Sequence, residues 1–203
     1  MEAAILSHSK GRPREFCVDT ALAAALRVFW SKGYEGASMA DLTDAMGITR
    51  PSLYAAFGNK ESLFRKALDL YEREKMCYMA AALDASTARS VAEKLLTGAL
   101  ENQTSNEEPR GCLGVISSVA CGAEAQTIRE EVMARSQAAH RSMVERMQRA
   151  IDEGDFNAPV DAEGIAKYLV AIVQGMAVQA GAGATREELQ RLVDTTLAVW
   201  PSR

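Results

Sequence analysis

Apolar residues recur every three or four positions along most of this chain, a spacing that places them on one face of a helix. Val18, Leu22, Leu26 and Phe29 follow this spacing between about residues 16 and 32, and Gly33 ends it. The same periodicity predicts further helices at residues 38–45, 49–57, 59–82, 88–103, 111–121, 124–153, 161–181 and 185–199. No apolar–polar alternation typical of strands separates these segments. The pattern therefore predicts an all-α fold of about nine helices.

The predicted helices divide the chain into three parts. Residues 1–14 are polar and end in a Lys-Gly-Arg-Pro-Arg run, which indicates a flexible basic arm. Residues 15–58 hold three short helices, which suit a small helix-turn-helix domain, called the head below. Residues 59–203 are expected to form a larger helical body, joined to the head by a linking helix at residues 59–82.

Charge is distributed unevenly between these parts. The chain of 203 residues has a formal net charge of −4, with 48% hydrophobic and 25% charged residues. Residues 1–66 hold nine Lys or Arg against seven Asp or Glu, a net of +2, and the remainder holds fourteen against twenty, a net of −6. An acidic body with a mildly basic head suits a protein that contacts a polyanion with one end only.

The reactive residue types argue against an enzyme. The four cysteines form no CxxC pair and share no metal-binding spacing with the two histidines. No HExxH, GxSxG or phosphate-loop motif occurs. We therefore expect neither catalysis nor a cofactor. The apolar runs are too short for a secretory leader or a membrane span, so a reducing cytoplasm is the expected location.

Residues 38–57 form the feature with the clearest functional meaning. Two short helices joined by a turn at Gly47 predict a helix-turn-helix. Ser38 is expected to cap the first helix, with Asp41 three residues on completing an imperfect capping box. Pro51 fits the first turn of the second helix, where its missing N–H has no partner in any case.

The second of these helices begins with side chains that suit DNA. The guanidinium of Arg50 can reach guanine O6 and N7 in the major groove, and the hydroxyls of Thr49, Ser52 and Tyr54 suit phosphate oxygens. Lys60 starts the next helix, where a cation opposes the helix dipole and a bound phosphate would resolve the conflict. Considered by spacing alone, these residues are equally compatible with an ordinary solvated surface.

This region closely resembles the TetR/AcrR family of bacterial regulators. The matching residues are Phe29, Gly33-Tyr34 and the run SMADLTDAMGITRPSLYAAFGNKESLF from Ser38 to Phe64. The resemblance implies a three-helix DNA-binding domain, a fourth helix that links it to the body, and a body that binds a ligand and forms a dimer.

The resemblance also implies which residues contact DNA. Base contacts are implied at the start of the recognition helix, and phosphate contacts from Tyr54 and Lys60. Ala55 and Ala56 depart from the family, which often has a bulky or polar residue there, so Arg50 is expected to carry more of the base reading. The arm either reaches DNA or is a solubilising tail. The predicted DNA contacts are Ser38, Thr49, Arg50, Pro51, Ser52, Tyr54 and Lys60, with Arg12 and Arg14 of the arm.

The resemblance assigns two roles to the body. The last two helices, rich in small residues, are implied to pair with their copies in a dimer interface, although burial within one monomer would give a similar composition. The expected interface residues are Leu169, Ile172, Gly175, Met176, Leu192 and Leu197. A pocket for a small apolar or amphipathic ligand is implied among the middle helices. Its candidate lining residues, for which plain core is the alternative, are Met76, Met79, Cys112, Ile116, Met143, Met147, Phe156 and Tyr168.

Together these features predict a homodimeric, sequence-specific regulator of double-stranded DNA. By the habit of the family, it is expected to be a repressor that a small molecule releases from a palindromic operator. One alternative is an electrophile or redox sensor based on Cys112, expected in the first turn of a helix beside Arg110. Cys121 lies about 13 Å away along a continuous helix, too far to pair with Cys112. The alternative from another class is a helical protein–protein adaptor, which salt-dependent binding to duplex DNA would exclude.

Overall fold

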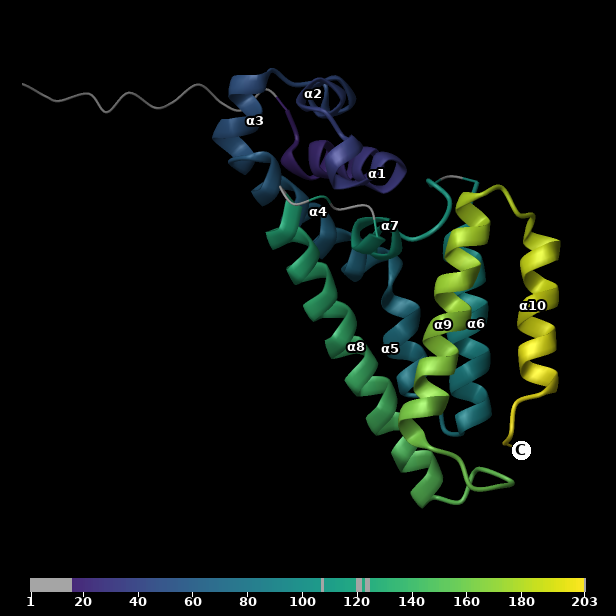
Figure 1. The fold of residues 1–203 in the computed structure, drawn as a ribbon. Helices are drawn as coiled ribbons and strands as arrows, with labels where there is room; N and C mark the ends of the chain where they lie inside the picture. The colour runs from purple at the N-terminus through teal and green to yellow at the C-terminus, as the bar shows by residue number, and fades with distance from the viewer. Residues whose placement is uncertain (1–15, 107, 120–121, 123–124, 203) are drawn as a thin grey trace, which may run out of the picture.

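The computed structural model describes residues 16–106, 108–119, 122 and 125–202. Within these ranges the chain is helical, with an isolated bridge between Phe156 and Ser202 as the β-type pairing. The described helices number ten instead of about nine, and the basic arm predicted at 1–14 lies outside the described residues. Their bounds are α1 (Val18–Gly36), α2 (Met39–Met46), α3 (Arg50–Phe57), α4 (Lys60–Lys75), α5 (Cys77–Leu83), α6 (Ala88–Thr104), α7 (Leu113–Val119), α8 (Gln126–Asp152), α9 (Ala162–Gly181) and α10 (Arg186–Ala198) (Figure 1).

Helices α1, α2 and α3 form the head, at one end of the molecule (Figure 1). Its core contains Phe29, Trp30, Leu42 and Leu53, all fully buried. Helix α1 is kinked near its end because Gly33 adopts φ 71° and ψ 176°, outside the helical region. Glycine is the residue that adopts this backbone conformation without strain. The helix stop predicted at Gly33 is thus present as a kink.

Helix α4 runs from the head into the body and continues the core of the head through Leu63, Phe64 and Tyr71. The prediction of one linking helix over residues 59–82 is wrong. The chain leaves the helical path at Met76, where φ is −108° and ψ is 9°, and α5 begins at Cys77. The sequence has neither glycine nor proline at this break, and the apolar periodicity continues through it. For this reason the sequence predicts one continuous helix.

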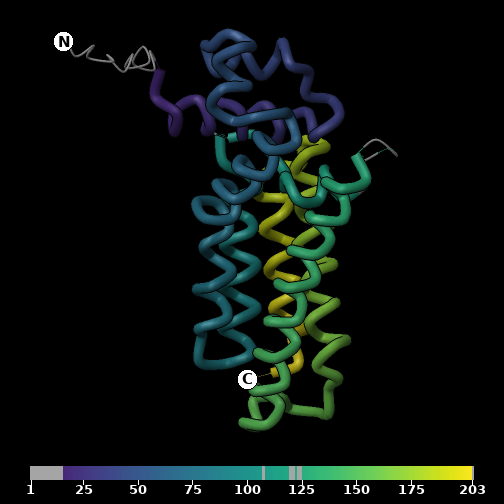
Figure 2. Tube along the Cα trace, turned by 90° about the vertical axis from the view of Figure 1, so that its left-hand side faces the viewer, coloured from purple at the N-terminus to yellow at the C-terminus, as the bar shows by residue number. Residues whose placement is uncertain are grey.

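The body is an elongated bundle that extends from the head and consists of helices α5, α6, α8, α9 and α10 (Figures 1 and 2). Helix α6 contacts α5, α8, α9 and α10 and supplies a row of buried residues to the core. Leu96 and Leu100 of α6 are fully buried, as is Met147 of α8. Among the described helices, none combines the length and the apolar character that crossing a membrane requires.

The short helix α7 lies at the junction of head and body, in contact with α1, α8 and α9 (Figure 1). Leu113 at its start is fully buried in the same cluster as the head core. Trp30 Nε1 donates to the carbonyl of Gly111 (3.3 Å), and a carboxylate oxygen of Glu35 accepts from the N–H of Gly122 (2.6 Å). Head and body therefore meet through a packed, hydrogen-bonded junction.

Candidate nucleic-acid interface and ligand cavity

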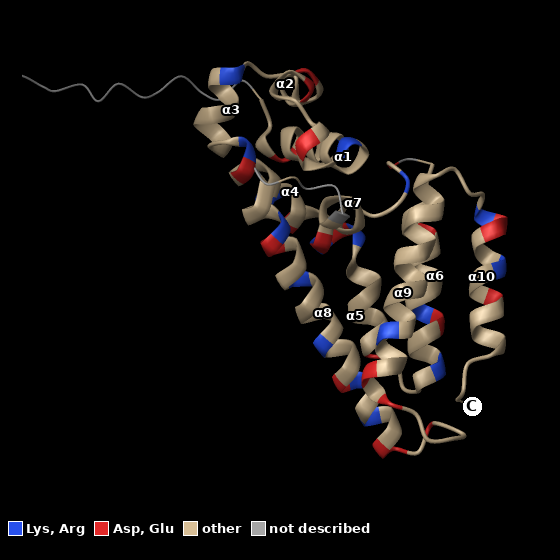
Figure 3. Ribbon diagram, in the orientation of Figure 1, with Lys and Arg blue, Asp and Glu red and all other residues tan. Residues whose placement is uncertain are grey.

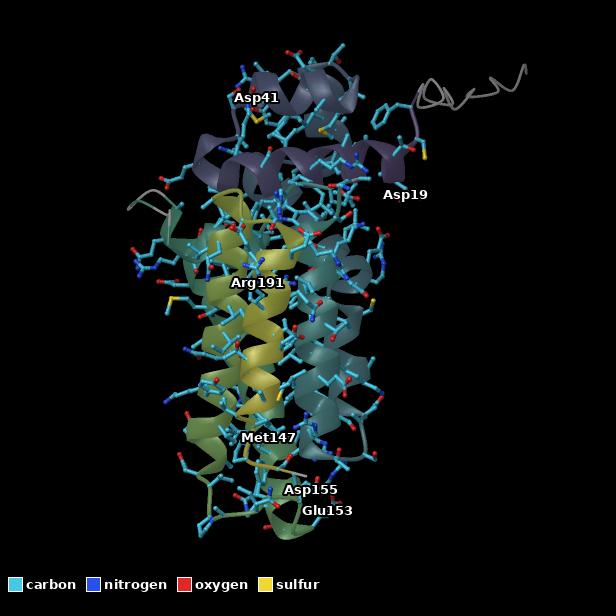
Figure 4. All side chains as sticks on the ribbon, turned by 90° about the vertical axis from the view of Figure 1, so that its right-hand side faces the viewer. Asp19, Asp41, Met147, Glu153, Asp155 and Arg191 are labelled. Atoms are coloured by element: carbon cyan, nitrogen blue, oxygen red, sulfur yellow. The ribbon has the colours of Figure 1, made fainter. Side chains whose placement is uncertain are left out.

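A reciprocal cap and an ion pair hold the start of α2. Ser38 Oγ accepts from the N–H of Asp41 (3.0 Å), and Asp41 Oδ2 accepts from the N–H of Ser38 (2.9 Å). Lys32 of α1 donates from Nζ to Asp41 Oδ1 (2.6 Å), which fastens α2 to α1. The Lys32 and Ser38 donors hold the pKa of the Asp41 carboxyl well below its usual range. Figure 4 shows Asp41 in the head, and the capping box is complete with Asp in place of Glu.

The recognition helix α3 presents its first turn to solvent. Thr49 Oγ1 caps the helix by accepting from the N–H of Ser52 (3.4 Å), and it lies 2.9 Å from Ser52 Oγ. Arg50 and Pro51 are exposed, and Tyr54, one turn after Arg50, is 47% exposed. No acidic residue lies in this first turn. The positive end of the helix dipole and the Arg50 guanidinium therefore form a local positive end that suits a phosphate backbone.

Lys60 occupies the first position of α4. Its Nζ lies over the ring of Tyr34, 4.6 Å from the centroid, in a cation–π contact. Partial burial lowers the pKa of Lys60, and the nearby carboxylate of Glu35 acts in the opposite direction. A bound phosphate is therefore not needed to explain a lysine at this position, because the ring of Tyr34 already holds the ammonium group in place.

The candidate DNA contacts form a small set within a surface of mixed charge. In Figure 3, α8 and α10 each carry residues of both signs. Arg50 and Lys60 supply the cationic groups of the set, while Ser38 belongs to the α2 cap. Arg12 and Arg14 of the predicted arm lie outside the described residues.

A cavity of about 570 Å³ lies among α4, α5, α6, α7, α8 and α9. This volume falls within the range of small-molecule sites, and its lining is mainly apolar, as such sites usually are. Four of the predicted lining residues do line it, namely Met76, Met79, Cys112 and Met143.

Two other predicted lining residues belong to the packing of helices. Ile116 of α7 packs against the head cluster, so closely that a Cβ built on Gly33 would lie 3.2 Å from its Cγ2. Met147 is fully buried in the body core, one helical turn beyond Met143 on α8. Figure 4 shows Met147 in the lower part of the body, near Asp155.

The last two predicted lining residues lie farther out. Phe156 follows the end of α8 and packs on Trp200, with ring centroids 6.3 Å apart. Tyr168 is 38% exposed on α9. The resemblance implied a pocket among the middle helices, but the sequence could not decide which side of each element faces the cavity.

One side of the cavity carries a network of paired charges around Arg135. Its guanidinium lies 2.7 Å from carboxylate oxygens of Asp69, Glu72 and Glu131. Burial alone would lower the pKa of Arg135, but the hydrogen bonds to these three carboxylates outweigh it and raise the pKa. The network ties α8 to α4 beside the cavity. Glu131 lies four residues before Arg135 on α8, but sequence reasoning missed the network because Asp69 and Glu72 lie more than sixty residues away along the chain.

The inner wall contains buried polar residues that sequence reasoning also missed. The Tyr71 hydroxyl, on a side chain only 2% exposed, donates to Cys112 Sγ (3.4 Å) and accepts from Asn102 Nδ2 (3.5 Å). Burial raises the pKa of Tyr71. Gln103, 1% exposed, donates from Nε2 to the carbonyl of Val173 (3.2 Å). No spacing rule within one helix relates these residues, which come from α4, α6 and α9.

The surroundings of Cys112 differ from those expected. Arg110 donates to the carbonyl of Ala184 and so is directed away from the thiol. Cys112 lies just before α7, and its hydrogen-bonding neighbour is the neutral hydroxyl of Tyr71. Cys121 lies outside the described residues. The cation predicted to activate Cys112 is therefore absent from its described contacts.

Comparison with known proteins decides the family. Residues 21–67 match the model of the bacterial regulatory proteins of the tetR family, and residues 92–196 match that of the tetracyclin repressor-like C-terminal domain. The chain belongs to the TetR family. It is accordingly a DNA-binding transcriptional regulator with a helix-turn-helix, as its resemblance predicted.

Relatives within the TetR family match nearly the full chain. The protein is 32% identical over 201 residues to the HTH-type transcriptional repressor ComR of Escherichia coli (strain K12), covering 95% of this chain and 93% of ComR. It is 28% identical over 183 residues to the repressor BdcR of the same organism, covering 90% of this chain and 88% of BdcR. A cysteine mutant of the TetR family regulator CifR, solved with 26-base-pair double-strand operator DNA, is 43% identical, with a TM-score of 0.88 over 94% of this chain and 100% of that chain.

The residues predicted for the dimer interface of this TetR-family chain divide into two groups. Leu169 and Met176 are fully buried within the monomer, which corrects their assignment to an interface between copies. Ile172, Leu192 and Leu197 are partly buried at the edge of the same core, and Gly175 is partly buried as well. These residues of α9 and α10 thus pack the two helices against the core of their own chain.

Proposed function

We propose that this TetR-family regulator is a homodimeric repressor that binds a palindromic operator and leaves it when a small molecule occupies the body cavity. The observation that carries the proposal is the exposed first turn of α3, with Thr49, Arg50 and Pro51 facing solvent at the end of the head. Arg50 reads guanine in the major groove, and Ser52, Tyr54 and Lys60 hold phosphates. Ser38 and the arm residues Arg12 and Arg14 add further backbone contacts.

The relatives support DNA as the target. ComR and BdcR are named transcriptional repressors, and the CifR mutant was solved on operator DNA. Because the target is chromosomal DNA, the proposed place of action is the bacterial cytoplasm.

An exposed apolar stripe on α9 supports the dimer. Tyr168, Ala171, Gly175 and Val178 follow one another at helical spacing, and Val178 is 60% exposed. No atom lies within 4 Å of a Cβ built on Gly175, so a second backbone can approach closely there. We propose that this stripe and the outer face of α10 pair with their copies across a two-fold axis. Such pairing sets two α3 helices at the fixed spacing that a palindromic site requires.

Helix α7 supports the coupling between cavity and head. Cys112, Val115 and Ser118, at or beside α7, line the cavity, while Leu113 and Ile116 pack against the head core. An occupant that displaces α7 therefore shifts the surface on which α1 rests. A ligand that prefers the DNA-incompetent arrangement by about 1–3 kcal/mol would weaken operator binding by roughly 5–150-fold.

The test begins with selection of bound sequences from random duplex DNA by the purified protein. We expect a palindrome with half-sites about one DNA turn apart. Fluorescence anisotropy on the selected duplex should show affinity that falls steeply as salt rises, because bound lysine and arginine displace counterions. A folded dimer that binds no duplex even at low salt would contradict the proposal and favour the adaptor.

The hydrogen bond from Tyr71 to Cys112 favours a second candidate within the same fold, a regulator that responds to electrophiles. This hydrogen bond holds the sulfur in the lining of the cavity, where a small electrophile can reach it. In a background that lacks the exposed Cys17 and Cys77, N-ethylmaleimide should release operator DNA from protein with Cys112 and leave Cys112→Ser bound. Equal release from both would end this candidate.

A further inference from the structure

One buried polar group of the cavity wall has an unused acceptor. Gln103 lines the cavity from α6, and its side chain is 1% exposed. Its Nε2 donates to the carbonyl of Val173 (3.2 Å), which fixes the orientation of the amide. Its Oε1 accepts no hydrogen bond from the described part of the chain. A buried carbonyl oxygen left in this state lowers stability, so a donor supplied by an occupant would be strongly favoured there.

The charged residues of the lining are already paired. Glu72 is the one carboxylate among the described lining residues, and it forms an ion pair with Arg135 (2.7 Å). His140 Nε2 lies 3.1 Å from a carboxylate oxygen of Glu163. A charged ligand would therefore enter a mainly apolar cavity without a free counter-charge, at a large cost in desolvation. The lining favours a neutral occupant.

The other buried polar groups beside the cavity already have hydrogen-bond partners. The Tyr71 hydroxyl both donates to Cys112 and accepts from Asn102. The Tyr78 hydroxyl donates to the thioether of Met76 (3.7 Å). Burial raises the pKa of both phenols, which keeps them neutral. Among these described residues, the strong polar atom without a hydrogen bond is thus the acceptor Gln103 Oε1. A ligand that satisfies it must supply a hydrogen-bond donor.

We infer that the effector is a neutral amphipathic molecule whose hydroxyl or amide N–H donates to Gln103 Oε1. Its apolar part packs on Leu95, Met143 and Val173, which line the same cavity. This inference rests on the proposed function, because it takes the cavity as the effector site. The volume of about 570 Å³ accommodates a small organic molecule of this type.

Four probes of similar apolar content test the ligand chemistry by calorimetry on the full-length protein. They are 1-octanol, its isomer dibutyl ether, octanoate and octylammonium. Only the alcohol is both neutral and able to donate a hydrogen bond. We expect 1-octanol to bind about tenfold more tightly than dibutyl ether, and both ions to bind more weakly than the alcohol.

Two variants of Gln103 locate the contact. Gln103→Leu keeps the size of the side chain but removes the acceptor, and should abolish the preference for 1-octanol over dibutyl ether. Gln103→Glu places a carboxylate in the wall and should shift the preference toward octylammonium. Gln174→Leu is the matched control, because Gln174 lines the same cavity but is exposed, and it should keep the alcohol preference. Thermal unfolding and operator binding without probe confirm that each variant is folded.

The outcomes separate this inference from the proposed function. Equal binding of the alcohol and the ether, survival of the preference in Gln103→Leu, or no binding of any probe would overturn the ligand assignment. If 1-octanol binds through Gln103 but does not release the selected operator duplex, the ligand assignment holds and the proposed release mechanism fails. Release of the duplex by 1-octanol from wild-type protein and not from Gln103→Leu would support both.

Discussion

The side chains at the exposed start of α3 and α4 are held in place within the protein itself. Thr49 caps α3 by accepting from the N–H of Ser52, and Lys60 rests on the ring of Tyr34. Side chains that are fixed before binding lose less conformational entropy when they meet a partner. We therefore expect Thr49 and Lys60 to meet DNA with little rearrangement of their side chains.

Arg50 and Lys60 are expected to differ in how their loss affects DNA binding. Arg50→Ala should cost about 1–3 kcal/mol at the cognate site and relax preference at one base position. Lys60→Ala should weaken binding to all sequences and lower the salt slope by about one. Anisotropy titrations on cognate and single-substituted duplexes at several salt concentrations measure both effects. The reverse pattern would show that the two roles are misassigned.

Asp41 predicts a dependence of stability on pH. Its folded-state pKa is held below the usual value of about 3.9, so its stabilising contribution is complete above that pH and is lost as the pH falls toward the folded-state pKa. Asp41→Asn should therefore lower the melting temperature at pH 7, and the difference from wild type should narrow at pH 3. Asp44→Asn, on the exposed side of the same helix, should change little at either pH. A difference that widens at pH 3 would contradict this assignment.

Single residues also show how far sequence could predict the sites. The Ser38–Asp41 cap and the exposed Arg50 were predictable because their spacing lies within one or two helical turns. The hydrogen bond of Gln103 and the links from Arg135 to Asp69 and Glu72 were not, because those partners come from helices far away in the chain. Local spacing identifies the residues of a helix terminus, whereas a cavity wall depends on how whole helices pack.

Among the elements, the junction between α1 and α7 depends on the kink at Gly33. The chain there has φ 71° and ψ 176°, a conformation that costs other residues about 1–3 kcal/mol, and an added Cβ would lie 3.2 Å from Ile116 Cγ2. Gly33→Ala should therefore destabilise the protein in urea unfolding. Gly36→Ala is the matched control, because Gly36 lacks a positive φ and its added Cβ would make an ordinary contact with Lys32 at 3.5 Å. Similar unfolding midpoints for the two variants would argue against a required kink.

Most helix bounds could be predicted from the sequence, and the predictions that failed did so for one physical reason. The expected helix at 88–103 is Ala88–Thr104, and that at 161–181 is Ala162–Gly181, because capping residues mark both starts. The linking helix failed because nothing local breaks it at Met76. Tertiary packing decides such a break, as it decides which faces of α9 are turned inward.

At the scale of the molecule, the fold sets the proposed DNA-binding surface and the proposed ligand cavity on opposite sides of one packed junction. Leu113, Ile128 and Val132 of the body belong to the same buried cluster as the head core. In the proposed mechanism, a change in the cavity reaches the head through this direct packing. One chain presents one recognition helix, however, so control of a palindromic site also requires that a second copy is held at a fixed distance.

The exposed stripe on α9 predicts how that second copy is held. Val178 is 60% exposed at helical spacing from Gly175, and a charge placed there would be buried without a partner in the proposed dimer. Val178→Glu should convert the protein to a monomer in analytical ultracentrifugation and weaken its binding to the full palindrome far more than to a single half-site. Ala134→Glu adds the same charge at an exposed position of α8 and should leave the dimer intact. A Val178→Glu protein that stays dimeric would place the interface elsewhere, whereas a monomer that still binds the palindrome at wild-type affinity would show that the two heads act independently.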